Sequence, residues 1–211
     1  MRKIRTFIAV TPPKDFLDKL TTIQEKLKAK NLQIAWEEPQ NFHITLVFLG
    51  QINQSQMETA AKATEIAAKS FLPFEARALG ISYFYKRGAD SIVFLDMADP
   101  QKNFRSLFKE LFGNLINLGF YPPTRFTAHI SLGRLKKKKL SPPERKKILA
   151  QIAETEVPDI GSFEVSAIDV YESVHDATAA KQRYHLLKRF PLEERWIYHF
   201  SQRRKKKWPG F

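Results

Sequence analysis

The sequence predicts an α+β fold of two similar lobes, because one order of elements occurs twice along the chain. In each half, a strand with a His-x-Thr/Ser motif is followed by a helix and then by two further strands. The chain has 211 residues, 43% of them hydrophobic and 12% aromatic, which is enough for a packed core. No Gly/Ser-rich linker separates the halves, so we expect interlocked lobes that share one sheet system.

Apolar spacing defines the elements of the first half. Alternation or apolar runs favour strands over residues 5–10, 42–49, 74–85 and 91–97, with a hairpin turn at 86–90. Spacing of three and four residues favours helices over 13–30, 55–69 and about 99–118. Gly119 is expected to end the last of these helices.

The second half repeats this order with different residues. Strands are predicted over 126–132, 163–171 and 184–190, and a helix over 142–153. Ser141 is the expected N-cap of that helix, and Glu144 stands at the capping-box position.

Two tetrapeptides with one pattern are the main candidate functional residues. They are His43-Ile44-Thr45-Leu46 and His129-Ile130-Ser131-Leu132, so two of only five histidines open the same motif. Side chains alternate along a strand, so His43 and Thr45 share a face with Val47 and Leu49. Phe42, Ile44, Leu46 and Phe48 are then expected in the core. Likewise, His129 and Ser131 share a face, while Ile130 and Leu132 face away.

The paired motifs point to acid–base chemistry on one substrate. Histidine titrates near neutral pH, so one imidazole can act as a base while the other acts as an acid. Nearby hydroxyls can hydrogen-bond phosphoryl oxygens. The chain contains no cysteine and no obvious metal-binding cluster, so we expect neither a metal nor another cofactor. We interpret His175, His185 and His199 as incidental.

The charge of the chain favours a polyanionic partner. The net charge is +13, with basic runs at 136–139 and 195–211. These runs are either solubilising surface charge or a rim that attracts phosphates, and composition leaves both readings open. The chain shows neither a signal-peptide pattern nor an apolar segment of bilayer length. We therefore expect a cytoplasmic monomer that does not bind membranes.

The motifs and their surroundings resemble the 2H phosphoesterases. More narrowly, they resemble the LigT/ThpR-type RNA 2′,3′-cyclic phosphodiesterases, historically called 2′-5′ RNA ligases. The similar segments are 5–10, Trp36, 41–50, 119–120, 126–134, 171–173, 184–187 and 190–192. Two residues depart from the usual pattern, with Ala128 in place of proline and Ser131 in place of threonine.

This resemblance implies one bilobal domain over residues 1–192, with two antiparallel sheets flanked by helices around a central cleft. Residues 193–211 form a basic extension beyond the usual end of the family. The implied activity is metal-independent hydrolysis of RNA or nucleotide 2′,3′-cyclic phosphates to 2′-phosphomonoesters. By matching motifs, His43 donates a proton to the leaving 3′-oxygen and His129 accepts one from water. Thr45 and Ser131 hold phosphate oxygens, and Arg134 binds phosphate.

Two alternatives remain open at this stage. The same acid–base pair could catalyse 2′-5′ RNA ligation or the cleavage of 2′-5′-linked oligonucleotides. The chain could instead be a non-catalytic RNA-binding module that uses its positive charge and the aromatic residues Phe7, Trp36, Tyr83, Phe84 and Tyr85. Ideal alternation also places Arg134 opposite His129, so its predicted role requires the strand to twist or end there.

Overall fold

The computed structural model describes residues 2–85, 90–136, 140–155, 158–176 and 181–192. Three features of the sequence analysis lie wholly or mostly outside these residues. They are the basic extension 193–211, the lysines at 137–139 and most of the hairpin turn at 86–90. No helix within the described residues is long and apolar enough to cross a bilayer.

The four predicted helices are confirmed, each to within a few residues of its expected ends. They are α1 (Lys14–Lys28), α2 (Gln54–Ala68), α3 (Asn103–Asn117) and α4 (Pro142–Ala153). The stripe predicted for α3 is buried, and Gly119 follows the helix with a positive φ of 83°. At the start of α4, the Ser141 N–H donates to the Glu144 carboxylate at 2.7 Å, as the capping-box pattern predicts.

The strands follow the predicted order, with two differences. They are β1 (Ile4–Val10), β2 (Ala35–Trp36), β3 (Ile44–Ile52), β4 (Phe74–Phe84), β5 (Ser91–Ala98), β6 (His129–Leu135), β7 (Ser162–Val165), β8 (Ala167–Asp176) and β9 (Lys181–Pro191). The short β2 is not predicted from sequence. The strand predicted over 163–171 is two strands, because the chain leaves the β4 ladder after Val165 and joins β1 from Asp169 onward.

All the strands belong to one antiparallel sheet with the order β7-β4-β5-β6-β3-β1-β8-β9, and β2 also pairs with β6. The α+β class is thus confirmed, but the two predicted sheets are one continuous sheet. Between β3 and β6 the ladder has a single Cα pair, Ile44 with Ile130. The two parts of the sheet are therefore joined at a narrow seam between the motif strands.

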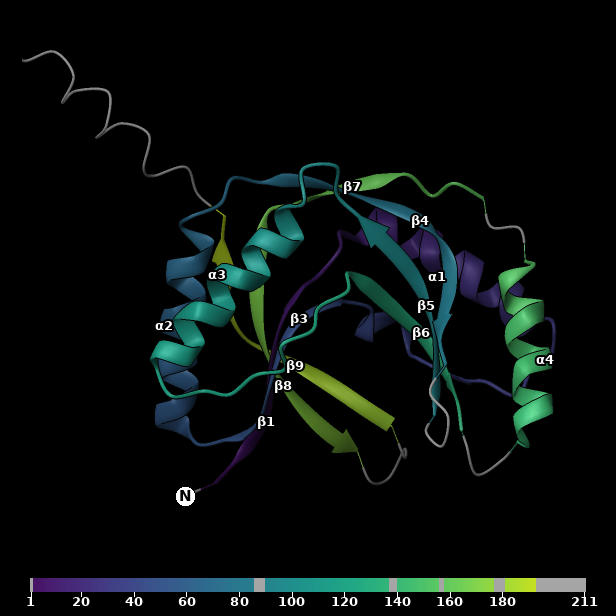
Figure 1. Ribbon diagram of the computed structural model, residues 1–211, viewed down its shortest axis with the longest axis horizontal. Helices are drawn as coiled ribbons and strands as arrows, with labels where there is room; N and C mark the ends of the chain where they lie inside the picture. The colour runs from purple at the N-terminus through teal and green to yellow at the C-terminus, as the bar shows by residue number, and fades with distance from the viewer. Residues whose placement is uncertain (1, 86–89, 137–139, 156–157, 177–180, 193–211) are drawn as a thin grey trace, which may run out of the picture.

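Neither half of the sheet is formed by one continuous segment of the chain. The terminal half contains β3, β1, β8 and β9 from the two ends of the chain, and the middle half contains β6, β5, β4, β7 and β2. Helices α2 and α3 lie side by side against the terminal half, on the left of Figure 1. Helix α4 packs on β4, and α1 contacts the middle half through Phe16 on Phe163. The two halves of the chain interlock because β5, which follows the first motif, pairs with the second-motif strand β6, and β4 pairs with β5.

Candidate active site

The two motifs meet at the seam of the sheet. Ile44 and Ile130 each lie between the histidine and the hydroxyl residue of their motif, and neither has any exposed surface. Because side chains alternate across a sheet, the neighbours of these isoleucines face the other side. His43, Thr45, His129 and Ser131 are all partly exposed there. The seam thus brings the four candidate residues to one face, which we call the cleft face.

Local hydrogen bonds hold the ring of His43. Its Nδ1 lies 2.6 Å from the carbonyl oxygen of Asn41, and its Nε2 lies 2.8 Å from Thr45 Oγ1. A carbonyl can only accept a hydrogen bond, so Nδ1 carries the proton in the neutral ring. Nε2 then accepts from the Thr45 hydroxyl. This arrangement makes Nε2 the nitrogen that can exchange a proton with a substrate.

The second motif repeats the contact that fixes the ring. His129 Nδ1 lies 2.8 Å from the carbonyl oxygen of Thr127, again two residues earlier in the chain. The same argument assigns the Nδ1 proton to the neutral ring and leaves Nε2 for chemistry. The duplication seen in the sequence therefore extends to the backbone contacts that orient the imidazoles.

Both imidazoles are neutral at neutral pH in the free protein. Burial lowers the pKa of His43 from 6.5 to about 4, and the neighbouring His129 lowers it further, against the Asn41 carbonyl. Burial also lowers the pKa of His129; the Thr127 carbonyl and Asp96 oppose this shift, while Arg134 adds to it.

Aromatic rings surround each histidine from neighbouring strands. His43 lies 4.8 Å from the ring of Phe7 and 5.1 Å from that of Tyr184. His129 lies 5.1 Å from each of Phe84 and Phe94. These rings exclude water from the imidazoles, which accounts for the burial that lowers their pKa values.

A β-bulge changes the direction of side chains in β3. Thr45 pairs with Ala9 but Val47 pairs with Ile8, so Leu46 is an extra residue in the ladder. Beyond it, Val47 is buried and Phe48 is 49% exposed. The predictions that Val47 shares the face of His43 and that Phe48 lies in the core are therefore wrong. Phe48 instead contacts Phe7 at 5.8 Å.

A second bulge brings Arg134 to the cleft face. Ser131 pairs with Phe94 and Gly133 with Val93, which leaves Leu132 as the extra residue of β6. The Leu132 carbonyl accepts hydrogen bonds from the Glu37 N–H at 2.9 Å and from Gln24 Nε2 at 3.0 Å. The sequence analysis required a twist or strand end here, and the bulge has that effect.

A cavity of about 460 Å³ adjoins His43, and we call it the cleft cavity. It shares Phe7 and Tyr184 with the surroundings of that histidine. Burial raises the pKa of Tyr184 to about 12, with the Glu37 charge adding to the effect, so the phenol is neutral. The lining residues are Arg5, Phe7, Ala35, Trp36, Glu37, Glu38, Phe48, Arg134, Lys136, Ser173, His175, Gln182 and Tyr184.

Asn41 connects both walls of this cavity to His43. Its side-chain Nδ2 donates to Glu37 Oε1 at 3.0 Å and to the Gln182 carbonyl at 2.7 Å, while its own carbonyl holds His43. Asn41 is only 4% exposed. The sequence analysis missed it as a functional residue, although it stands two residues before the motif histidine.

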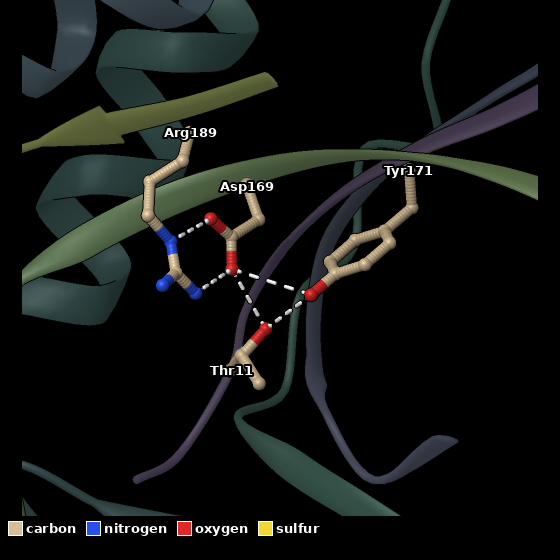
Figure 2. A network of polar contacts seen from close by, with 4 residues as sticks. All are labelled: Thr11, Asp169, Tyr171 and Arg189. Atoms are coloured by element: carbon tan, nitrogen blue, oxygen red, sulfur yellow. Dashed lines mark hydrogen bonds and ion pairs between the residues drawn. The ribbon is translucent and has the colours of Figure 1, made fainter. Parts of the chain in front are cut away.

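A polar network lies beside Phe7 (Figure 2). The carboxylate of Asp169, 1% exposed, accepts from Arg189 Nε at 2.7 Å and Nη2 at 2.9 Å, and from the Thr11 hydroxyl at 2.7 Å. Thr11 Oγ1 also lies 2.7 Å from the hydroxyl of Tyr171. Tyr171 stacks on Phe7 at 5.3 Å, so the network supports the ring that contacts His43.

The sequence analysis set aside several residues that lie beside the motifs. Phe7 and Phe84 were considered only as RNA-stacking or core aromatics, yet they contact the two histidines. His175 was interpreted as incidental, and it lines the cleft cavity. Tyr184 was noted only as part of a closing strand. Alternation along β8 and β9 could have placed Tyr184 and His175 on a common face only if the partner strands had been known.

Comparisons with known proteins agree with this architecture. Residues 10–94 match the family described as LigT like phosphoesterase. The RNA 2′,3′-cyclic phosphodiesterase of Methanothermobacter thermautotrophicus is 28% identical over 171 residues, which cover 81% of this chain and 90% of that protein. The similarity to this relative therefore extends well beyond the segment that matches the family model.

Solved structures share the fold at lower identity. The protein TT0787 of Thermus thermophilus matches with a TM-score of 0.69 and 22% identity, over 90% of this chain and 98% of that one. E. coli LigT, in a crystal structure complexed with 3′-AMP, matches with a TM-score of 0.66 and 21% identity, over 92% and 100% of the two chains. The resemblance predicted from the twin motifs is therefore confirmed: the chain is similar to LigT-like phosphoesterases in sequence and to LigT in fold.

Proposed function

We propose that this protein hydrolyses the 2′,3′-cyclic phosphate of RNA ends or nucleotides to a 2′-phosphomonoester, without a metal ion. The observation that carries the proposal is the Ile44–Ile130 pair, which turns one imidazole and one hydroxyl of each motif toward the same face. Relatives named RNA 2′,3′-cyclic phosphodiesterase, 25–28% identical over about four fifths of the chain, support the same reaction.

In the proposed reaction, His43 is the acid and His129 is the base. Water attacks phosphorus, the bond between phosphorus and the ribose 3′-oxygen breaks, and His43 Nε2 supplies the proton for that oxygen. His129 Nε2 takes the proton of the attacking water. One turnover thus leaves His43 neutral and His129 protonated, and proton exchange with solvent restores the starting state.

Because the pKa of His43 is low, the bound substrate must help to protonate this residue before it can act as the acid. In the free protein His43 is neutral at pH 7, and a proton on the nearby His129 would further disfavour its protonation. A cyclic phosphate carries one negative charge, which favours a protonated imidazole beside it. His43 would then take up a proton as the substrate binds. Arg134 contributes to the lowered pKa of His129, which keeps that imidazole unprotonated before the reaction.

The hydroxyls of Thr45 and Ser131 would donate to phosphoryl oxygens, where charge develops as the ring opens. Thr45 now donates to His43 Nε2, and protonation of that nitrogen would release its hydroxyl for the phosphate. Proton uptake by His43 and phosphate binding by Thr45 would therefore reinforce each other. Arg134 would add a fixed positive charge from the adjoining cavity.

Product analysis tests this proposal directly. A nucleoside 2′,3′-cyclic phosphate is incubated with the protein in excess EDTA, and the 2′- and 3′-monophosphates are resolved. We expect the 2′-product, and we expect His43→Ala and His129→Ala each to reduce kcat by about 10²- to 10⁴-fold. His185→Ala is the matched control, because His185 is exposed on β9 and does not line the cavity.

Three other outcomes would contradict parts of the proposal or favour a different function. Full activity in both motif variants would contradict the assigned roles, and inhibition by EDTA would contradict metal independence. Tight RNA binding with no opening of any cyclic phosphate would favour the non-catalytic RNA-binding module.

The exposed ring of Phe84 favours a second candidate reaction at the same centre. Phe84 is 37% exposed and contacts His129 edge-on, on the other side of the seam from Phe7 and Tyr184. A second nucleoside stacked there could attack the cyclic phosphate with a sugar hydroxyl in place of water. The bond from phosphorus to the 3′-oxygen would break and a 2′-5′ linkage would form, and the reverse reaction would cleave such a linkage. Incubating a cyclic-phosphate oligonucleotide with a 5′-hydroxyl acceptor would detect the ligated product, and Phe84→Ala should reduce ligation more than hydrolysis.

A further inference from the structure

We propose that the cleft cavity is a nucleotide subsite in which Arg5 and Ser173 bind the 5′-phosphate of the nucleotide whose cyclic phosphate is opened. This inference rests on the proposed function, because it places the reacting phosphate between the two motifs. It adds a site that recognises a second group of the substrate, the 5′-phosphate that every nucleotide inside an RNA chain carries.

The cavity has the size and the walls that a nucleoside requires. Its volume of about 460 Å³ lies within the roughly 300–1,000 Å³ typical of small-molecule sites. Phe7 and Tyr184 form the end nearest His43, and Trp36 and the exposed ring of Phe48 add aromatic surface. Aromatic side chains bind bases of any sequence by stacking. A nucleoside in the cavity would therefore start beside the reacting phosphate.

Arg5 and Ser173 form an anion site farther along the same wall. They are opposite each other in the β1–β8 ladder, and both line the cavity. Ser173 Oγ accepts a hydrogen bond from Gln182 Nε2 at 2.6 Å, which leaves the serine O–H available to donate. Arg5 makes no ion pair with any residue that the structure describes. A guanidinium and a hydroxyl donor together suit a phosphate.

The spacing along β1 matches one nucleotide. Arg5 lies two residues before Phe7 on the same face of the strand, which corresponds to about 7 Å. Phe7 contacts His43, so Arg5 is separated from the reacting centre by about the length of one ribose with its linkages. A single nucleotide could thus place its cyclic phosphate at the motifs and its 5′-phosphate at Arg5.

The remaining charges of the cavity favour this orientation. Glu37 and Glu38 follow β2 on the wall that also carries Arg134, the residue assigned to the reacting phosphate, and Lys136 forms an ion pair with Asp90 at 3.2 Å. Arg5 and Ser173 lie on the other wall, formed by β1 and β8. The carboxylates would instead accept hydrogen bonds from the hydroxyl or amino groups of a nucleoside.

Paired substrates test the subsite during turnover. The kcat/KM values are measured for adenosine 2′,3′-cyclic phosphate and for the same nucleotide with a 5′-phosphate. We expect the parent protein to prefer the 5′-phosphorylated substrate by roughly ten- to 100-fold, as charge-assisted hydrogen bonds predict. Arg5→Gln should bring this ratio close to one, and Ser173→Ala should reduce it part of the way. Lys62→Gln, on the exposed face of α2, is the charge-matched control and should keep the full preference.

A binding measurement keeps the proposal independent of catalysis. Calorimetry compares adenosine 2′,5′-bisphosphate with adenosine 2′-monophosphate, and the 5′-phosphate should improve Kd by a similar factor in the parent protein but not in Arg5→Gln. If neither cyclic substrate is opened yet this difference is found, the proposed function fails and the subsite stands. The subsite is overturned if the parent protein shows no preference, or if Arg5→Gln weakens both nucleotides by the same factor.

Discussion

Ile44 of β3 lies opposite Ile130 of β6, and this pair alone joins the ladders of the two sheet halves. Because the strands are antiparallel, the His-to-hydroxyl order is reversed across the seam. Each imidazole is therefore next to the hydroxyl of the other motif as well as its own. The duplicated motif thus produces a nearly symmetric set of groups, and the surroundings of each histidine determine what it does.

Asn41 should be a positioning residue for His43. Asn41→Ala removes the donors to Glu37 Oε1 and the Gln182 carbonyl, so the backbone that holds His43 Nδ1 loses its anchor. We expect kcat on a cyclic phosphate to fall about tenfold, and the free energy of unfolding to fall by about 1–3 kcal/mol. Steady-state kinetics and urea unfolding measure both. Asn103→Ala is the control and should match the parent protein, because the Asn103 amide donates its hydrogen bond to the exposed Gln101.

The neutral His43 should make the protein less stable as the pH falls. The unfolded chain takes up a proton on this residue near pH 6.5, whereas the folded chain does so only near its pKa of about 4. The free energy of unfolding should therefore fall between these pH values, by on the order of 3 kcal/mol from this residue. Urea unfolding at several pH values measures the slope in the parent protein and in His43→Gln.

Carboxylates also titrate in this range, so the prediction concerns the difference between the two proteins. The slope should be smaller in His43→Gln, and His185→Gln on the exposed side of β9 should retain the slope of the parent protein. Equal slopes in all three would show that His43 gains its proton as readily in the folded state as in the unfolded one.

Gly133 should tolerate no side chain. A Cβ at this position would lie 2.5 Å from Ile34 Cγ2, 3.1 Å from the Ala35 carbonyl and 3.2 Å from Trp36 Cε3. Gly133→Ala should therefore displace β2 and cost about 1–3 kcal/mol of stability. Gly113→Ala is the contrast, because it lies within α3 with nothing within 4 Å and should stabilise the protein by up to about 1 kcal/mol. Thermal unfolding of the two variants should shift Tm in opposite directions.

The ion pair between the buried Asp169 of β8 and Arg189 of β9 should contribute far more to stability than the exposed pair of Arg2. Arg189→Ala removes two hydrogen bonds from the Asp169 carboxylate, which is 1% exposed, and should cost about 1–3 kcal/mol. Glu172, also on β8, pairs with Arg2, whose side chain is 83% exposed. Arg2→Ala should therefore change stability by less than about 1 kcal/mol. Because Tyr171 links the Asp169 network to Phe7, only Arg189→Ala should also lower activity.

Local patterns predicted the elements well, since each helix carries its own apolar stripe. The stripe of α3 and the cap of α4 depend on residues close in sequence, and both are as expected. The bulges at Leu46 and Leu132 depend on how many residues the partner strand contributes, which no single strand reveals. For this reason Phe48 was wrongly predicted to face the core. The sequence alone also could not show how Arg134 comes to lie on the same face as His129.

In the candidate site too, the residues set by local sequence were predicted and those set by distant partners were not. The histidines and hydroxyls were identifiable because their spacing is repeated within four residues. Asn41 was not, because one of its partners, Gln182, comes from the far end of the chain. The interleaved sheet has the same origin, since alternation shows that a strand has two faces but not which strands flank it.

The late position of β8 and β9 sets the order in which the protein can assemble during synthesis. Once β6 has left the ribosome, both motifs exist, and β1 already has β3 as a partner. Its other edge stays open until β8 emerges, because Arg5 to Ala9 pair with that strand. A chain that stopped before Ala167 would carry both histidines but would lack Tyr171 and Tyr184. Premature termination near the end of translation would therefore yield an inactive product with an exposed strand edge, which makes it prone to aggregate.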